Sequence, residues 1–334
     1  MINTPMDVLE QFPIRKTNAQ KQAFREATVS YAREKGYAVA VESGKRGVQN
    51  IVIGDPNQAK YLVTAHYDTP SSIGLPNFIT PNNPVTYFGI QFLLVGILLA
   101  ISVGCAWLAA WATGIEELML PVWYVLYFGI LVLMLMGPAN RNNANDNTSG
   151  VVTVLEILST IPDNLRDRVC FVLFDLEERG LVGSAAFRKA HKVTTEKQIV
   201  LNLDCVGDGD VIQLVPTKKA KKDGTLLEQL EKICTTVGDK ELRLRAKGFT
   251  AGSSDHKNFP YGVGIMALPS PNSMNRSICF LKQAQLCSMV SLVIMLRISV
   301  RPEGSPIMAV PPPLRAMGRF PAICSRFIRH RAIK

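Results

Sequence analysis

The stretch "AKYLVTAHYD", residues 59–68, decides the fold because it reads as a buried strand that ends in polar side chains. Side chains two residues apart on a strand point to the same side, so His66 and Asp68 face one way. A histidine beside a carboxylate at the end of a strand suits a metal ligand held by a hydrogen-bonded partner. An H-x-D pair on its own is a weak signal, and such a pair is more often structural.

Predicted strands and helices alternate on both sides of this stretch. Apolar periodicity predicts helices over residues 18–35, 149–161, 180–192 and 225–238, and strands over residues 37–42, 49–54, 167–175, 198–204, 210–216 and 263–268. This alternation predicts an α/β fold with a central, mostly parallel sheet that helices cover on both faces.

Two apolar runs interrupt the α/β pattern soon after Asp68. Residues 87–112 and 118–136 contain no charged side chain, and each run is long enough to cross ~30 Å of hydrocarbon as a helix. The short connection "TGIEE" makes the runs a hairpin whose two ends lie on one side of a membrane. The alternative is that the two runs are buried core helices. Soluble domains rarely contain two uncharged runs of this length in succession. Residues suited to a membrane interface occur in both runs: Trp107, Trp111, Trp123 and Tyr124.

The chain is therefore expected to consist of four segments. Residues 1–84 and 138–268 form the two parts of one α/β domain. Residues 85–137 form a transmembrane hairpin inserted into that domain, so the lipid bilayer is an expected partner. Residues 269–334 form a basic tail rich in proline and arginine.

The flanks of the hairpin favour a cytoplasmic domain in an integral protein of the cell membrane. Glu116 and Glu117 lie at the tip of the hairpin and Arg141 follows its second run, which agrees with the positive-inside rule. The N-terminal residues show no signal-peptide pattern. The seven cysteines form no C-x-x-C pair, which is typical of reduced thiols in a cytosol.

The net charge of +10 does not indicate a nucleic-acid partner, because its excess lies in the tail. Lysine and arginine greatly outnumber the single acid of that segment, Glu303, whereas acids and bases nearly balance in the rest of the chain. A nearly neutral domain offers no basic face for nucleic acid.

Further acidic residues occur where predicted elements end or begin. Asp146 comes just before a helix in "NANDNTSG", where it is either an ordinary N-cap or a carboxylate stabilised by the helix start. Glu177 and Glu178 follow a buried strand, and metal charge can offset the repulsion of two adjacent acids there. Asp204 ends another strand. Open α/β sheets bind ligands at the carboxyl ends of their strands, so this recurrence indicates a metal site.

Together these motifs resemble the M28 family of zinc aminopeptidases. The resemblance rests on the order H-x-D, D-N-x-S-G, E-E-x-G-x-x-G-S, a strand-terminal Asp and S-D-H, over about residues 15–268. It implies a hydrolase that binds two zinc ions and removes N-terminal residues from peptides. By this resemblance His66 and Asp204 bind one zinc, Asp146 bridges both ions, and Glu178 binds the second.

The resemblance also assigns residues that do not bind metal. Glu177 is the general base that takes a proton from the attacking water, and Asp68 orients His66. The S-D-H segment flanks the substrate pocket and consists of Ser254, Asp255 and His256.

The chain departs from the family after Leu268. The family places a fifth metal ligand, a histidine in an H-T-x-x-D-T-like segment, downstream of S-D-H, and the only later histidine here is His330, outside any such segment. One zinc position is therefore well liganded and the other is not. The predicted function is a membrane-anchored zinc aminopeptidase, and the alternative is an impaired or non-catalytic domain of the same type. Residues 269–334 are either a frameshift product or a diverged tail that binds anionic lipid.

Overall fold

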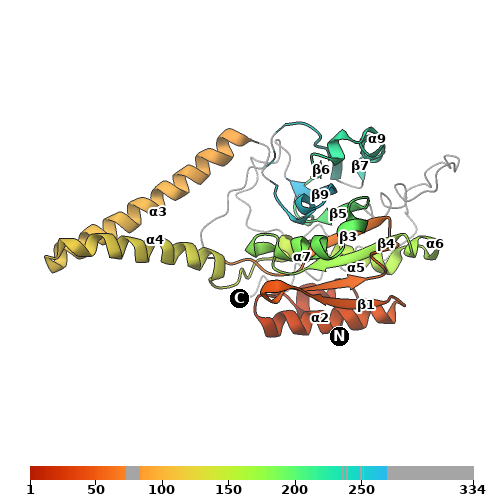
Figure 1. Ribbon diagram of the computed structural model, residues 1–334, viewed down its shortest axis with the longest axis horizontal. Coiled ribbons are helices and arrows are strands. Elements are labelled where there is room, and N and C mark those ends of the chain that lie inside the picture. Colours follow the sequence, from red (N-terminus) through yellow and green to blue (C-terminus); the bar gives the residue numbers. More distant parts are fainter. Residues whose placement is uncertain (73–82, 235, 238–239, 249, 251, 269–334) are drawn as a thin grey trace, which may run out of the picture.

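A computed structural model describes residues 1–72, 83–234, 236–237, 240–248, 250 and 252–268 (Figure 1). The predicted tail, residues 269–334, lies outside the described residues. The described chain forms a nine-stranded sheet in the order β1-β2-β4-β3-β5-β9-β6-β8-β7. The strands are β1 (Val39–Ser43), β2 (Gln49–Ile53), β3 (Tyr61–His66), β4 (Val169–Phe174), β5 (Ile199–Leu203), β6 (Val211–Pro216), β7 (Thr236–Val237), β8 (Lys240–Leu244) and β9 (Tyr261–Leu268).

The centre of the sheet is parallel, as the sequence predicts. Strand β3 pairs in parallel with β4 on one side and β5 on the other, and β5 pairs in parallel with β9. Antiparallel pairs flank this centre, at β1–β2, β2–β4, β6–β9 and β7–β8. The turn between β1 and β2 is too short for a parallel crossover, so that pair must be antiparallel. The parallel part is the part that positions the functional site.

Helices cover both faces of the parallel centre. The side chains of β3 and β4 are buried along their whole length, as expected for strands packed on both faces. Helices α2 (Asn18–Glu34), α5 (Ser149–Thr160) and α9 (Gly224–Ile233) contribute to the larger apolar cluster, which contains Phe24 and Phe171. Helix α7 (Val182–Ala190) contributes Phe187 to the smaller cluster, where it meets Phe174 and Phe259. The short helices are α1 (Asp7–Gln11), α6 (Asp163–Arg166) and α8 (Lys192–Thr195).

Two predicted helices differ from the structure. The helix predicted over residues 225–238 is wrong beyond Ile233, where the chain turns into the antiparallel pair β7–β8. Thr236 and Val237 are β-branched and favour a strand once a partner strand is present. The helix predicted from residue 180 begins only at Val182, because Gly180 and Leu181 both have positive φ angles.

The two uncharged runs form long helices, α3 (Pro84–Thr113) and α4 (Met119–Met136). They extend away from the sheet and approach each other at their far ends, where the 3-10 turn Glu116–Leu118 joins them (Figure 1). By length and composition both are able to cross a membrane. The helices contact each other, and the buried residues of α3 are small and spaced four apart: Ser102, Ala106 and Ala110. Small residues at this spacing let two apolar helices approach closely.

Candidate metal centre

The structure brings the sequence-predicted metal ligands to one edge of the sheet. His66 ends β3, Asp204 directly follows β5, and Glu177 and Glu178 lie shortly after β4. Because these three strands are parallel neighbours, their carboxyl ends meet at the same edge. Asp146 reaches this edge from the turn before α5.

The first group of ligand atoms consists of His66, Asp146 and Asp204. His66 Nε2 lies 3.3 Å from Asp146 Oδ1 and 3.7 Å from Asp204 Oδ1. The three ligand atoms all lie within 4.8 Å of one another, and the His66 ring is buried. These are the residues that the sequence assigns to the better-liganded zinc position.

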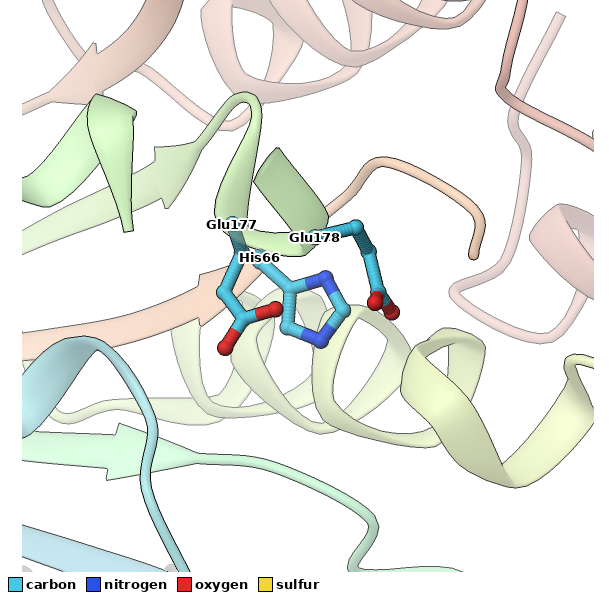
Figure 2. A group of neighbouring side chains, drawn as sticks. All are labelled: His66, Glu177 and Glu178. Atoms are coloured by element: carbon cyan, nitrogen blue, oxygen red, sulfur yellow. The ribbon is translucent and has the colours of Figure 1, made fainter. Parts of the chain in front are cut away.

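The second group consists of His66, Glu177 and Glu178, whose ligand atoms also lie within 4.8 Å of one another. The two carboxylates lie on either side of the His66 ring (Figure 2). Both glutamates belong to a short 3-10 turn, and residues with positive φ angles, Leu176 and Gly180, flank that turn. The family resemblance implied that Glu178 shares a position with Asp146, whereas the structure groups it with His66 and Glu177.

Asp68 supports this arrangement from behind. Its Oδ1 lies 3.5 Å from His66 Nδ1, and an orienting role for Asp68 stays a prediction. The same carboxylate accepts hydrogen bonds from the backbone N–H groups of Glu177, at 3.0 Å, and Glu178, at 3.3 Å. Asp68 therefore fixes the turn that carries the two glutamates and lies beside the imidazole ring.

Two asparagine side chains hold the Asp146 and Asp204 segments together. Asn147 donates to the backbone oxygen of Leu203, and Asn145 accepts from two backbone N–H groups just beyond Asp204. Gly150 permits this approach, because a Cβ at that position would lie 2.3 Å from Asn147 Oδ1. The D-N-x-S-G pattern thus has a packing reason as well as a chemical one.

Burial dominates the electrostatics of the site. It raises the pKa of Glu177 to about 10 and that of Glu178 to about 8, and neighbouring carboxylates contribute in the same direction. Burial also acts to raise the pKa of Asp204, but the nearby charge of His66 outweighs it and lowers that pKa to about 2. Burial lowers the pKa of His66 less than the surrounding carboxylates raise it. The carboxyl groups of the site therefore outnumber the one imidazole, and the charge of His66 cannot neutralise all of them.

The donor set suits zinc. Zinc in catalytic sites takes three protein ligands from nitrogen and oxygen donors, and the first group offers one imidazole nitrogen and two carboxylates. Asp204 Oδ1 is buried and has no hydrogen-bond partner among the described residues. A buried carboxylate oxygen without a donor is costly unless a cation compensates it.

The predicted substrate-binding segment lies buried beneath this edge, in the 3-10 turn that follows Ser254. Ser254 accepts a hydrogen bond of 2.8 Å from Asn202, and the charge of Asp255 contributes to the raised pKa of Glu177. The His256 ring packs against Gly264 on β9, and burial lowers the pKa of His256 to about 4. Contact of these residues with substrate stays a prediction.

The described residues do not provide the fifth ligand. His256 joins neither of the two candidate metal groups found there, and His191 instead pairs with Glu42 at 2.9 Å. His330 lies outside the described residues.

Sequence reasoning missed the buried cation of this site, Arg15. Its guanidinium donates to the backbone oxygens of Phe12 and Tyr67 and, at 3.0 Å, to Thr148 Oγ1. Its backbone also pairs with Thr69 through two hydrogen bonds. Arg15 thus joins the segment after His66 to the segment after Asp146, and burial lowers its pKa only to about 10. Because a lone arginine outside any periodic stretch gives no signal, only the fold reveals this contact.

Comparison with known proteins agrees with this site. Residues 132–277 match the model of Peptidase family M28, which confirms the expected resemblance over the part of the chain that contains Asp146, Glu177, Glu178 and Asp204. The match does not extend to His66 and Asp68. No curated protein sequence matches the chain.

Three solved structures show the shared fold. Glutaminyl cyclase from Porphyromonas gingivalis is 15% identical with a TM-score of 0.54, and the match covers 89% of this chain and 96% of that one. The aminopeptidase LapA from Legionella pneumophila is 14% identical with a TM-score of 0.50, over 89% and 70%. A Zn-dependent exopeptidase from Parabacteroides distasonis is 15% identical with a TM-score of 0.50, over 87% and 94%. At identities this low the structural matches establish the shared fold alone. The reaction has to be argued from the residues of the site.

Proposed function

We propose that this chain is a membrane-anchored, zinc-dependent aminopeptidase that hydrolyses the N-terminal residues of peptides at a site for two metal ions. One observation carries the proposal: an imidazole and four carboxylates converge at the carboxyl ends of three parallel strands. The match to Peptidase family M28 supports a hydrolase, and an aminopeptidase and an exopeptidase share the fold.

The residues present define how zinc would be held. His66, Asp146 and Asp204, which form one candidate group in the structure, would hold the first ion. Asp146 and Glu178 are the ligands that the family resemblance implies for the second ion. When bound, zinc supplies a Lewis acid that polarises the scissile carbonyl and makes water easier to deprotonate.

The protein's own side chains move the proton and fix the geometry. Glu177 lies outside the first ligand group but forms the second candidate group with His66 and Glu178. By the family resemblance its carboxylate would take a proton from the attacking water and pass it to the departing amine. Asp68 holds the backbone of Glu177 in place through a hydrogen bond of 3.0 Å.

The hairpin supplies the proposed anchor. Helices α3 and α4 expose large apolar side chains along their length, and neither contains a charged residue. Lipid would cover these side chains and leave both parts of the α/β domain on one side of the membrane. Arg141, directly after the hairpin, favours the cytoplasmic side.

A catalytically impaired domain is the second candidate, because of the missing fifth ligand. The second position has only Asp146 and Glu178 among its predicted ligands, which is fewer than a catalytic zinc usually has. On this reading the 334-residue chain binds about one zinc ion, because three ligands hold only the first position. It shows little aminopeptidase activity.

Metal analysis combined with an activity assay separates these candidates. The purified protein, kept in detergent, is analysed for zinc and assayed on aminoacyl-p-nitroanilides and on a peptide with an N-terminal glutamine. Two zinc ions per chain and release of free amino acids support the aminopeptidase. One zinc ion and no release favour the impaired domain. Cyclisation of the N-terminal glutamine without release of amino acids would replace the proposal with a cyclase activity.

A further inference from the structure

The hairpin joins the α/β domain at residues 70–72 and 138–140, which together are called its root below. Residues 70–72 pair with residues 138–140 through an antiparallel bridge between Ser71 and Ala139, and a backbone hydrogen bond of 2.9 Å lies on each side of that bridge. Ser71 Oγ also donates to the backbone oxygen of Leu135, in the last turn of α4, at 2.7 Å. The end of α4 is therefore tied to the segment that leads out of the metal centre.

The root is only a few residues from the metal ligands on both chain segments. Ser71 lies three residues after Asp68, so at ~3.3–3.6 Å per residue the two are at most about 11 Å apart along the chain. On the other segment, Asn143 lies three residues before Asp146, and its side chain donates to Thr69 Oγ1 at 2.7 Å. This hydrogen bond holds the two segments together between the root and the metal centre.

The last turn of α4 indicates where the hydrocarbon layer of the membrane ends. Leu135 and Met136 are each 62% exposed, and the first charged residue after them is Arg141. If the bilayer covers α4 to its end, the hydrocarbon boundary lies at residue 136. The polar headgroup layer is ~5–8 Å thick on each side of the hydrocarbon. The layer therefore reaches the root, and Asp68 lies no more than about 11 Å from Ser71 at that root.

Basic side chains lie at or close to this root, where Lys16 contacts Ser71 and Arg141 follows Ala139 by two residues. Lys16 Nζ contacts Ser71 Oγ, and burial lowers its pKa, an effect that Arg179 strengthens and Glu178 opposes. Arg179 and Arg141 are exposed. Basic residues at this height attract the phosphates of anionic lipids, which would hold the edge of the domain against the bilayer surface.

We infer that the site takes peptides whose N-terminus lies at the bilayer surface, meaning the free N-terminal segments of membrane-inserted or surface-bound peptides. The inference rests on the proposed aminopeptidase function and on the proposed anchor. In each cycle water would split the first peptide bond, releasing one amino acid and leaving a new amine on the shortened peptide. A substrate in bulk water gains nothing from this placement, whereas a membrane-bound one meets the site directly.

The extent to which the protein trims a membrane-anchored peptide measures the distance of the site from the hydrocarbon layer. The full-length protein is placed in liposomes of phosphatidylcholine and phosphatidylglycerol with a transmembrane peptide that has a polar N-terminal segment of twenty residues, and the products are read by mass spectrometry. We expect trimming to stop with about three to five residues outside the hydrocarbon, the number that spans ~10–15 Å. Products that retain more than about nine residues would place the site ~30 Å from the membrane and would overturn the inference.

A photo-crosslinking experiment tests the same placement without activity. Benzoylphenylalanine is placed at Phe92, Arg141, Arg179 or Asp163 of the chain in these liposomes, with a headgroup-tagged phospholipid present. Phe92 is an exposed hairpin position, and Asp163 lies on α6, at the end of the domain away from the hairpin (Figure 1).

Each pattern of lipid crosslinks has a distinct meaning. Crosslinks at Phe92, Arg141 and Arg179 but not at Asp163 support the inference. Crosslinks at Phe92 alone overturn it and leave the anchor intact. Their absence at Phe92 shows that the anchor itself is wrong.

Discussion

The α/β domain and the hairpin use the same apolar residue types in opposite ways. Phe171 and Val172 on β4 are fully buried, whereas Phe92 on α3 is 75% exposed and Val125 on α4 is 72% exposed. The domain removes its apolar surface from water by internal packing. The hairpin buries little except small residues between its two helices. The contrast is the one expected for two regions built for different solvents, water and lipid, and it makes matched substitutions informative.

The largest effect is expected in the metal centre of the domain. Glu177→Gln should lower peptide hydrolysis by ~10²–10⁴-fold while zinc content stays nearly unchanged, because it removes only the general base. Asp146→Asn should instead lose zinc, since both proposed ions share its carboxylate. Rates are measured at saturating zinc in detergent, against whatever rate the wild-type chain shows.

Glu228→Gln is the matched control, because Glu228 is an exposed residue that pairs only with Lys232 on the same helix. It should change neither rate nor zinc content. A Glu177 variant with the wild-type rate would remove this residue from the mechanism.

Deleting a phenyl ring should cost much more in the domain than in the hairpin. Phe171→Ala leaves a cavity in the packed core and should lower the free energy of unfolding by ~3–5 kcal/mol. Phe92→Ala should weaken membrane insertion by only about 0.5 kcal/mol. Denaturant unfolding measures the first variant and an insertion assay the second. Equal losses would mean that α3 is a core helix rather than a lipid-facing one.

Adding a charge at one exposed valine in each region tests the same contrast from the opposite direction. Val125→Lys should disfavour insertion of the hairpin by ~3 kcal/mol, because a charge in the hydrocarbon is costly. Val193→Lys, at a position that is 83% exposed on α8, should change stability by no more than about 0.5 kcal/mol. Fractionation in the absence of detergent compares the variants. If Val125→Lys behaves like Val193→Lys, water and not lipid surrounds α4.

The smallest expected effect concerns helix caps, where the two regions should behave alike. Thr17 caps α2 in a capping box with Gln20, and Asn83 caps α3 by accepting a hydrogen bond from the Thr86 N–H at 3.1 Å. Thr17→Ala and Asn83→Ala should each cost about 1 kcal/mol, because a cap satisfies only its own first turn. Melting of the domain reports on the first substitution and protease sensitivity at the hairpin base on the second. A much larger loss at Asn83 would show that its segment is buried by something beyond its own helix.

Much of the fold was predictable from the sequence because hydrophobic patterns differ by solvent and by element. The uncharged runs predicted both long helices, and continuous apolar stretches predicted β3 and β4. The pair β7–β8 was missed. β7 has only two residues, and the alternation of polar and apolar residues in β8 is too short to mark a strand without its pairing to β6.

The sequence predicts which residues form the metal centre better than it predicts how those residues are arranged. Acidic residues at strand ends marked Asp204 and the two glutamates, since parallel strands end at one edge. That both glutamates flank His66 depends on the positive φ angle of Leu176, which the apolar pattern does not encode. The contacts of Arg15 depend on two loops distant in sequence, so they too emerge only in three dimensions.

The bridge between Ser71 and Ala139 makes the hairpin a removable module. The chain leaves and re-enters the domain on neighbouring antiparallel segments, the geometry that a tight two-residue turn also closes. An ancestral domain could therefore have gained the hairpin, or lost it, without rearranging a single strand. By the same logic, replacing residues 73–137 with a short Asn-Gly turn should yield a water-soluble enzyme domain. Sedimentation without detergent and an unchanged zinc content would report success, and aggregation of that variant would show that the domain relies on the hairpin to fold.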